Sequence, residues 1–141
     1  MKIFFDANIC LDLLDSKRPT SKESIEWYMH NKDNDSMEFY FSSDFITTFY
    51  YILTQKRKYD TVEVINAIEA LSLEIDPFYL SHVDFLLAKE SFLNGVSEDF
   101  EDLMILESAV RLGSDVFVTN DKALLSLKKF KGVDIITPKI V

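Results

Sequence analysis

The sequence is poor in several residue types that define particular classes of protein. Its 141 residues include three Gly, three Pro and one Cys, which excludes a collagen-like repeat, a Gly- or Pro-rich linker and an internal disulfide framework. No apolar run approaches the roughly 20 residues of a membrane-spanning helix, and no charged-then-apolar leader precedes a small-residue cleavage site. We therefore expect a cytoplasmic protein with no membrane partner.

Positive charge is also scarce. The chain has 15 Lys and Arg against 24 Asp and Glu, which gives a net charge of −9. Bulk electrostatic attraction therefore cannot hold nucleic acid, because phosphate backbones bind surfaces rich in Lys and Arg. Any phosphate-bearing partner has to be met by local basic patches or by metal ions.

Apolar runs alternate with helical patterns along the whole chain. Five short runs are predicted as strands, at residues 2–5, 38–41, 73–75, 115–118 and 133–136. The segments between them carry apolar residues at spacings of three and four, which is typical of amphipathic helices. Alternating strands and helices form parallel sheets, and near-continuous apolar strands are buried on both faces. We therefore predict a single α/β domain over residues 1–141.

Three signals predict where helices begin and end. Thr20 stands three residues before Glu23, and Asp60 stands three residues before Glu63, which is the spacing of a capping box. Gly113 follows the last apolar residue of a helical pattern, where a left-handed residue is favoured. These positions give the expected boundaries of three helices.

Acidic residues follow two of the predicted strands. Asp6 comes directly after the first strand, and Asp121 comes a few residues after the fourth. In an open parallel sheet, the carboxyl ends of the strands form the edge where ligands bind. Taken singly, each residue is more simply explained as a helix N-cap. Two such carboxylates in one crevice repel each other unless a cation lies between them, and oxygen ligands of this kind suit Mg²⁺ or Mn²⁺.

A third acidic group opens the helix that leads into the fourth strand. Asp99 has the position of an N-cap, and Glu101 and Asp102 follow in the first turn, where they would complement the helix dipole. The sequence alone leaves open whether this helix start lies at the same edge of the sheet as Asp6 and Asp121.

Four stretches occur in a recognisable order. Phe-Phe-Asp-Ala-Asn opens the chain before an apolar helix, Asp99-Phe-Glu-Asp102 opens an acidic helix, Val-Phe-Val-Thr119-Asn-Asp121 ends a strand, and Ile-Ile-Thr-Pro138 follows the last strand. In this order and spacing, they resemble the PIN domain family, and especially its VapC-type toxin nucleases, over nearly the full length of the chain. Each motif is short, and the order of all four carries the resemblance.

The resemblance implies a three-layer α/β/α fold whose five-stranded parallel sheet has the order 3-2-1-4-5. It implies that the helix carrying Asp102 starts in the same pocket, so that the catalytic and metal-binding residues are Asp6, Asp102 and Asp121. Asp99 would be either a fourth metal ligand or only the helix cap. Asn8 and Thr119 would orient ligands, waters or phosphate.

The chain departs from the family pattern at Thr48. Many PIN domains carry a Glu at this place, on the helix after the second strand, although one branch of the family has a neutral residue. The change removes one negative charge from the pocket, so a second metal ion would bind weakly or arrive with the phosphate of the substrate. Asp44 lies one turn before Thr48, and we predict that it partly replaces the missing Glu.

The resemblance further implies a Mg²⁺- or Mn²⁺-dependent endoribonuclease that cleaves single-stranded RNA. It implies a homodimer and a small antitoxin protein as partner. A group of basic residues after Asp121 adjoins the expected site and is predicted to contact the RNA backbone, although such residues near helix ends also complement the helix dipole. The group consists of Lys122, Lys128, Lys129 and Lys131.

Two other functions stay open. A PIN-like domain that has lost catalysis would bind RNA or a protein, which Thr48 favours and the complete set of three aspartates disfavours. A receiver-type α/β domain would need a phospho-acceptor Asp at the end of the third strand. The only candidate, Asp76, is followed by Pro77, and this pair predicts a turn.

Overall fold

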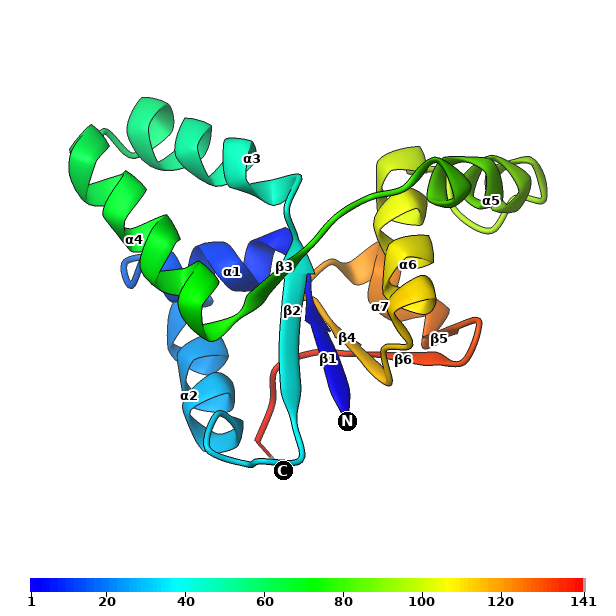
Figure 1. Cartoon of the computed structure of the whole chain (residues 1–141), viewed down its shortest axis with the longest axis horizontal. Helices are drawn as coiled ribbons and strands as arrows, with labels where there is room; N and C mark the ends of the chain where they lie inside the picture. The colour runs from blue at the N-terminus through cyan, green and yellow to red at the C-terminus, as the bar shows by residue number, and fades with distance from the viewer. Residues whose placement is uncertain (141) are drawn as a thin grey trace.

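A computed structural model describes residues 1–140, and its centre is a six-stranded sheet (Figure 1). The strands are β1 (Lys2–Phe5), β2 (Glu38–Ser42), β3 (Asp76–Phe78), β4 (Val116–Val118), β5 (Lys129–Phe130) and β6 (Val133–Ile136). Their order in the sheet is β3-β2-β1-β4-β6-β5. All neighbouring strands are parallel except β5, which is antiparallel to β6.

The predicted α/β fold and the order of the five parallel strands are confirmed, because β6 takes the fifth place. The predicted strand count is one too low. The additional strand, β5, has two residues and forms a hairpin with β6. Lys131 and Gly132 connect the two strands, and both have positive φ angles, 47° and 88°, as a tight hairpin turn requires. Two residues are too few to show a strand pattern in the sequence.

The third strand lies later in the chain than predicted. Residues 73 and 74 end the helix α4 (Thr61–Glu74), and β3 begins at Asp76. The predicted turn at Asp76 and Pro77 is therefore wrong. Pro77 is compatible with this strand because β3 is at the edge of the sheet, where proline removes no hydrogen bond that a second neighbour would need.

Helices cover both faces of the sheet (Figure 1). One side carries α1 (Ala7–Leu14), α2 (Ser21–Asn31), α3 (Phe45–Tyr51), a π-helical turn that continues α3 (Ile52–Lys56), and α4. The other side carries α5 (His82–Leu93), α6 (Phe100–Leu112) and α7 (Lys122–Leu127). None of the helices in residues 1–140 is both long and apolar enough to cross a lipid bilayer.

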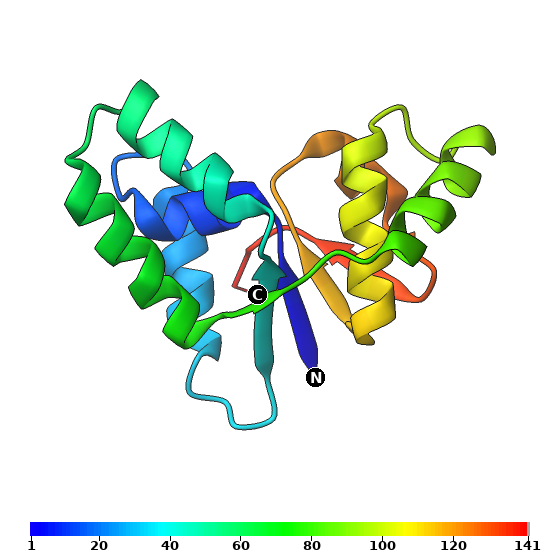
Figure 2. The same ribbon diagram turned by 45° about the horizontal axis from the view of Figure 1, so that its top comes forward.

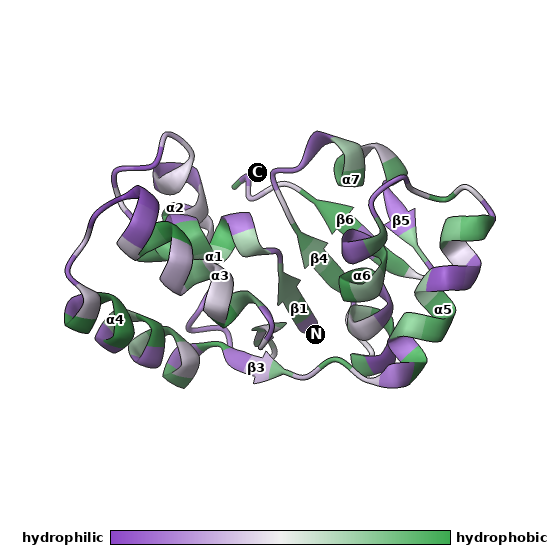
Figure 3. Ribbon diagram, turned by 90° about the horizontal axis from the view of Figure 1, so that it is seen from above, coloured by the Kyte–Doolittle hydropathy of each residue, from purple (hydrophilic) through white to green (hydrophobic). Residues whose placement is uncertain are grey.

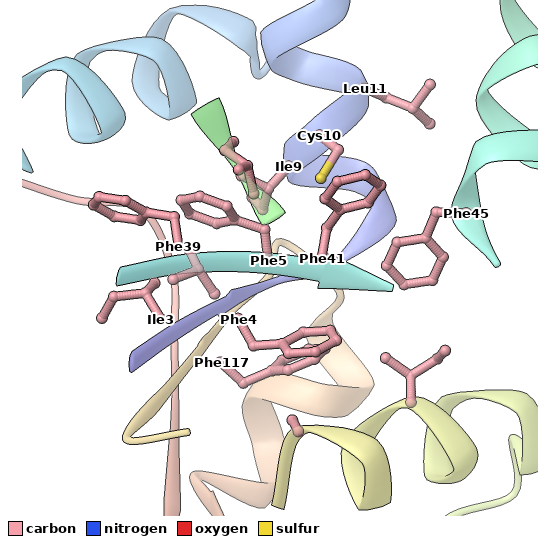
Figure 4. Packing of buried hydrophobic residues seen from close by; sticks show 14 of the residues in the cluster. Ile3, Phe4, Phe5, Ile9, Cys10, Leu11, Phe39, Phe41, Phe45 and Phe117 are labelled. Carbon is pink, nitrogen blue, oxygen red and sulfur yellow. The ribbon is translucent and has the colours of Figure 1, made fainter. Parts of the chain in front are cut away.

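Aromatic side chains fill both interfaces between the sheet and the helices. Phe5 stacks on Phe39 with ring centroids 5.7 Å apart, and Phe41 lies on the same side, under α1 (Figure 4). Phe4 stacks on Phe117 at 5.7 Å on the opposite face. Burial of each ring contributes about 1.5–3 kcal/mol. Because both faces are packed, the carboxyl edge of the sheet is the part of it that can receive a ligand.

Two of the three predicted helix boundaries have the expected caps. The side chain of Asp60 accepts a hydrogen bond from the backbone N–H of Glu63 at 3.1 Å, and Gly113 ends α6 with a φ of 83°. The capping box at Thr20 is wrong. Its hydroxyl donates to the carboxylate of Asp12 at 2.8 Å instead, because a charged acceptor makes the stronger hydrogen bond.

The direction of α6 answers the question that the sequence left open. This helix runs opposite to β4, the strand that follows it, so its N-terminus lies near the carboxyl ends of β1 and β4 (Figures 1 and 2). The first turn of α6 is therefore at the same edge of the sheet as the ends of these strands. Asp99 and Asp102 are both in this region.

Candidate functional site

Asp6 lies between β1 and α1, and donors surround its carboxylate. Its Oδ1 accepts from the backbone N–H of Ala7 at 2.8 Å, and its Oδ2 accepts from the Thr119 hydroxyl at 2.7 Å and the Asn8 amide at 3.1 Å. The residue is only 8% exposed. Burial raises the pKa of Asp6, and the charge of Asp121 raises it further, although the hydrogen bonds act in the opposite direction.

Asn8 and Thr119 hold Asp6 in one orientation. The Thr119 hydroxyl also accepts hydrogen bonds from the backbone N–H of Asp121 at 3.0 Å and from the Asn8 amide at 3.3 Å. The side-chain oxygen of Asn8 accepts from the backbone N–H of Asn120 at 3.0 Å. These contacts tie the end of β1 to the loop after β4. That either side chain also orients water or phosphate stays a prediction.

Asp121 caps α7, as the simpler explanation of its sequence position predicts. Its Oδ1 accepts hydrogen bonds from the backbone N–H groups of Ala123 at 2.8 Å and Leu124 at 3.2 Å. Among the described residues, its Oδ2 has no hydrogen-bond partner. One oxygen of Asp121 is therefore fixed by the helix, and the other is free for a ligand.

Asp102 carries the clearest electrostatic sign of a shared site. It lies in the first turn of α6, where burial raises its pKa to about 7, with further contributions from the charges of Asp6, Asp99 and Asp121. Asp99 caps the same helix by accepting from the backbone N–H of Asp102 at 3.1 Å. The fold thus brings together four acidic side chains that are up to 115 positions apart in the sequence.

This group fits a cation by its charge, but its side chains do not yet form a coordination sphere. Within residues 1–140, no three Asp, Glu, His or Cys side chains converge closely enough to hold one metal ion. Both oxygens of Asp6 and one of Asp121 accept hydrogen bonds instead. A divalent cation would offset the repulsion among these carboxylates, which adds to the effect of burial on the pKa of Asp102. The all-oxygen donor set suits Mg²⁺ or Mn²⁺, which take further ligands from water and phosphate.

A cleft of about 480 Å³ opens between α3 and α6, beside Asp6. Its polar lining includes Asp44 and Thr48 on the α3 side, and Asp102 on the α6 side. Asp44 and Thr48 are both exposed, so an acidic group faces the cleft although Thr48 is neutral. That Asp44 replaces the usual Glu stays a prediction.

The basic residues after Asp121 differ in whether an acidic side chain already pairs with them. Lys122 and Lys128 are exposed, whereas the ammonium group of Lys129 lies 3.4 Å from Asp134. Lys131 is paired with the buried carboxylate of Glu107 at 2.5 Å, so its charge is already neutralised. Contact of Lys122, Lys128 and Lys129 with RNA stays a prediction.

The sequence reasoning missed one acidic residue close to this site. Asp12, in α1, is fully buried and accepts hydrogen bonds from Arg18 at 2.8 Å, Ser24 at 2.5 Å and Asn120 at 3.4 Å. The available signal was an acidic residue between two leucines on an apolar helix face. Such a residue has to find partners within the fold.

Comparison with known proteins gives a consistent result. A profile of the PIN domain matches residues 2–123. Ribonuclease VapC1 of Aquifex aeolicus (strain VF5) is 30% identical over 131 residues, which cover 89% of this chain and 85% of that protein.

Solved structures with the same fold include two VapBC complexes and one VapC toxin. VapBC2 from Rickettsia felis, bound to a DNA fragment from its promoter, has a TM-score of 0.72 at 13% identity and covers 97% of this chain and 98% of its own. VapC20 of Mycobacterium tuberculosis, a toxin that cleaves the sarcin-ricin loop, has a TM-score of 0.71 at 13% identity, and the match covers 94% of this chain and 98% of VapC20. VapBC-1 from nontypeable Haemophilus influenzae has a TM-score of 0.64 at 20% identity, and the match covers 90% of this chain and 92% of that one.

Proposed function

This chain belongs to the PIN domain family, and from that premise we propose that it is a divalent-metal-dependent endoribonuclease that cleaves single-stranded RNA as the toxin of a toxin–antitoxin pair. The observation that carries the proposal is the gathering of four acidic side chains at the carboxyl edge of the sheet, where burial, and then the charges of Asp6, Asp99 and Asp121, raise the pKa of Asp102 to about 7. The related ribonuclease VapC1 supports the reaction class.

The catalytic residues in this proposal are Asp6, Asp102 and Asp121, which would hold Mg²⁺ or Mn²⁺. When bound, such an ion lowers the pKa of water and stabilises the oxygen that leaves the phosphodiester. Thr119 and Asn8 fix the carboxylate of Asp6. Asp102 has to release its proton before its oxygens can bind a cation, because its pKa is raised to about 7.

Asp99 and Asp44 have secondary roles in this proposal. Asp99 holds the first turn of α6 and adds negative charge beside Asp102. Asp44 supplies the acidic group on the α3 side of the cleft, because Thr48 is neutral. Since Thr48 adds no negative charge, a second ion would bind weakly in the absence of substrate phosphate.

The RNA backbone would pass along the start of α7. Lys122 directly follows Asp121, and Lys128 and Lys129 follow the end of the same short helix. Phosphate contacts come chiefly from such side chains. Because the whole chain has a net charge of −9, this local patch would have to overcome a general repulsion, and its three lysines should give RNA binding only a modest dependence on salt concentration.

We also propose that the protein is cytoplasmic, forms a homodimer and binds a small antitoxin. Two of the structural neighbours are VapBC complexes, which supports an antitoxin. The homodimer would use α5, whose ribbon is largely hydrophobic and lies at the edge of the molecule (Figure 3). Its exposed apolar side chains are Val83, Phe85, Leu86, Phe92 and Leu93. A contiguous group of exposed apolar side chains is normally covered in the assembled protein.

A catalytically weakened RNA- or protein-binding domain is the second candidate, and Thr48 is the observation that favours it. Cleavage of single-stranded RNA in Mn²⁺, Mg²⁺ or EDTA separates the two functions. Asp6→Asn should reduce the rate by about 100-fold or more, because bound metal contributes several kcal/mol to the barrier. Asp35→Asn, the same change in an exposed loop, is the matched control.

The outcomes of this experiment are distinct. RNA binding without Mn²⁺-dependent cleavage by the wild-type protein would favour the binding domain. An unchanged rate in Asp6→Asn, with the rate in Asp35→Asn also unchanged, would end the metal-dependent nuclease proposal.

A further inference from the structure

A buried hydrogen-bond network links α1 to the loop after β4. Asp12 is fully buried, and its Oδ2 accepts from the Nδ2 of Asn120 at 3.4 Å and from the Ser24 hydroxyl at 2.5 Å. Its Oδ1 accepts from Arg18 and Thr20, both at 2.8 Å. A buried carboxylate with four donors has one stable orientation, because losing any donor would leave an oxygen partly unsatisfied.

Asn120 is held at both ends of its side chain. Its Nδ2 donates to Asp12, and its Oδ1 accepts from the hydroxyl of Thr137 at 3.2 Å, in the segment after β6. Its backbone N–H donates to the side-chain oxygen of Asn8 at 3.0 Å. Two of these contacts come from α1 and one from the segment after β6, and together they fix the peptide that leads into Asp121.

We infer that Asp12 and Asn120 are positioning residues, which set the direction in which Asp121 presents its free oxygen to a divalent cation. The inference rests on the proposed function. Neither residue needs to touch the substrate or the ion, because partners behind a metal ligand determine its orientation and affinity. In this arrangement, Asn120 anchors the backbone before Asp121, and the start of α7 anchors its Oδ1.

A merely structural role would have a different signature. The buried Asp12 forms an ion pair with the partly exposed Arg18, and this pair alone could hold α1 against the start of α2. Such a pair would affect the melting temperature without changing cation affinity in the folded protein. The contact to Asn120 is what connects the network to the loop of Asp121, so cation affinity is the discriminating measurement.

The test exchanges the carboxylate and the amide. Asp12→Asn places an amide donor against the amide donor of Asn120, and Asn120→Asp places a carboxylate against the carboxylate of Asp12. The double variant again pairs one donor with one acceptor, now in reverse. The oxygen at position 12 can still accept from Arg18, and the Ser24 hydroxyl can accept from the new amide. Charge is the same in the double variant and the wild type.

Three readouts are compared for each variant. They are the Kd for Mn²⁺ from calorimetry, the hydrogen-exchange rate of the backbone amides of residues 119–121, and the melting temperature. Asp12→Asn is expected to weaken Mn²⁺ binding about 10-fold, and both single variants are expected to speed exchange in this loop. The double variant is expected to recover most of both losses.

A milder variant keeps the test decisive if the single variants fail to fold. Thr137→Val removes only the hydroxyl that donates to Asn120, so it should also weaken Mn²⁺ binding and speed exchange in residues 119–121. Thr61→Val, at the exposed start of α4, is the matched control and should change neither.

The failures of this inference and of the proposed function are distinguishable. If the folded variants, Thr137→Val included, bind Mn²⁺ and exchange their amides as the wild type does, the network is only structural and the inference is overturned, while the proposed function stands. If the wild type binds no Mn²⁺, the proposed function fails and the positioning of a metal ligand fails with it.

Discussion

Replacing Asp102 by Asn should stabilise the metal-free protein above neutral pH. In the folded state, burial and the charges of Asp6, Asp99 and Asp121 raise the pKa of Asp102 from 3.8 to about 7. An ionised Asp102 is therefore unfavourable in the folded protein. Asn has nearly the same shape and cannot ionise, so Asp102→Asn removes this unfavourable charge.

The size and pH dependence of the effect follow from proton linkage. The folded protein keeps this proton up to about pH 7, whereas the unfolded chain releases it near pH 3.8. Between these values the folded state binds more protons, so wild-type stability falls as the pH rises through this window. The full shift corresponds to about 4 kcal/mol. Because solvent and salt screen a partly exposed side chain, we expect about 1–2 kcal/mol.

The assay is thermal unfolding in EDTA at pH values from 3 to 8. Asp102→Asn should melt about 3–8 °C above the wild type at pH 8, and the difference should vanish below pH 3.8, where both states carry the proton. Asp35→Asn, in an exposed loop, serves as the control and should melt with the wild type throughout. Added Mn²⁺ should reverse the ranking, because only the wild type gains stability from a bound cation.

Two results would refute this reasoning. Equal melting temperatures for wild type and Asp102→Asn at pH 8 would mean that neither burial nor the neighbouring carboxylates raise the pKa of Asp102. An equal gain from Mn²⁺ in both proteins would mean that Asp102 does not hold the ion.

Three further predictions concern the cleft, the end of α6 and the Lys131–Glu107 ion pair. Thr48→Glu should tighten Mn²⁺ binding by about tenfold, since a carboxylate near a cation contributes at least about 1.4 kcal/mol. An unchanged Kd for Mn²⁺ in calorimetry would mean that Thr48 lies away from the ion. Gly113→Ala should lower the free energy of unfolding in urea by about 1 kcal/mol, because its φ is 83°, and no loss would mean that the end of α6 adjusts. Lys131→Met should lower the free energy of unfolding in urea by about 1–2 kcal/mol, because it leaves the buried Glu107 without its ion-pair partner. This loss is smaller than for a fully buried pair, because the Lys131 side chain is 43% exposed. An unchanged unfolding midpoint would mean that solvent replaces the ion pair.

The sequence predicted the parts of the site that local patterns determine. Asp6 directly follows one apolar strand and Asp121 comes shortly after another, and parallel strands bring their carboxyl ends to one edge. The position of Asp102 was harder to predict, because it depends on the direction of α6 relative to the sheet. Only the resemblance to a known family indicated that direction. Asp12 was missed, since its partner Asn120 is 108 positions away and no local pattern indicates such a contact.

The errors in the predicted fold have similar causes. The apolar pattern of α4 continues to its last turn, so residues 73–75 were predicted as a strand although the helix includes Leu73. Pro77 suggested a turn, but an edge strand accepts proline. Thr20 had the spacing of a capping residue, but its hydroxyl donates a hydrogen bond to the buried carboxylate of Asp12 instead. For Pro77 and Thr20, a tertiary contact, with β2 and with Asp12 respectively, decided between two locally acceptable structures.

The two explanations of the acidic residues, helix caps and cation ligands, are complementary. Asp6, Asp99 and Asp121 each accept a hydrogen bond from a backbone N–H at a helix start, where free N–H groups and the helix dipole stabilise negative charge. Among the described residues, Asp102 receives no such hydrogen bond, and its pKa is raised to about 7. Three carboxylates are thus held in place by helix N-termini before any cation arrives, and the fourth keeps its proton up to about pH 7 in the metal-free protein.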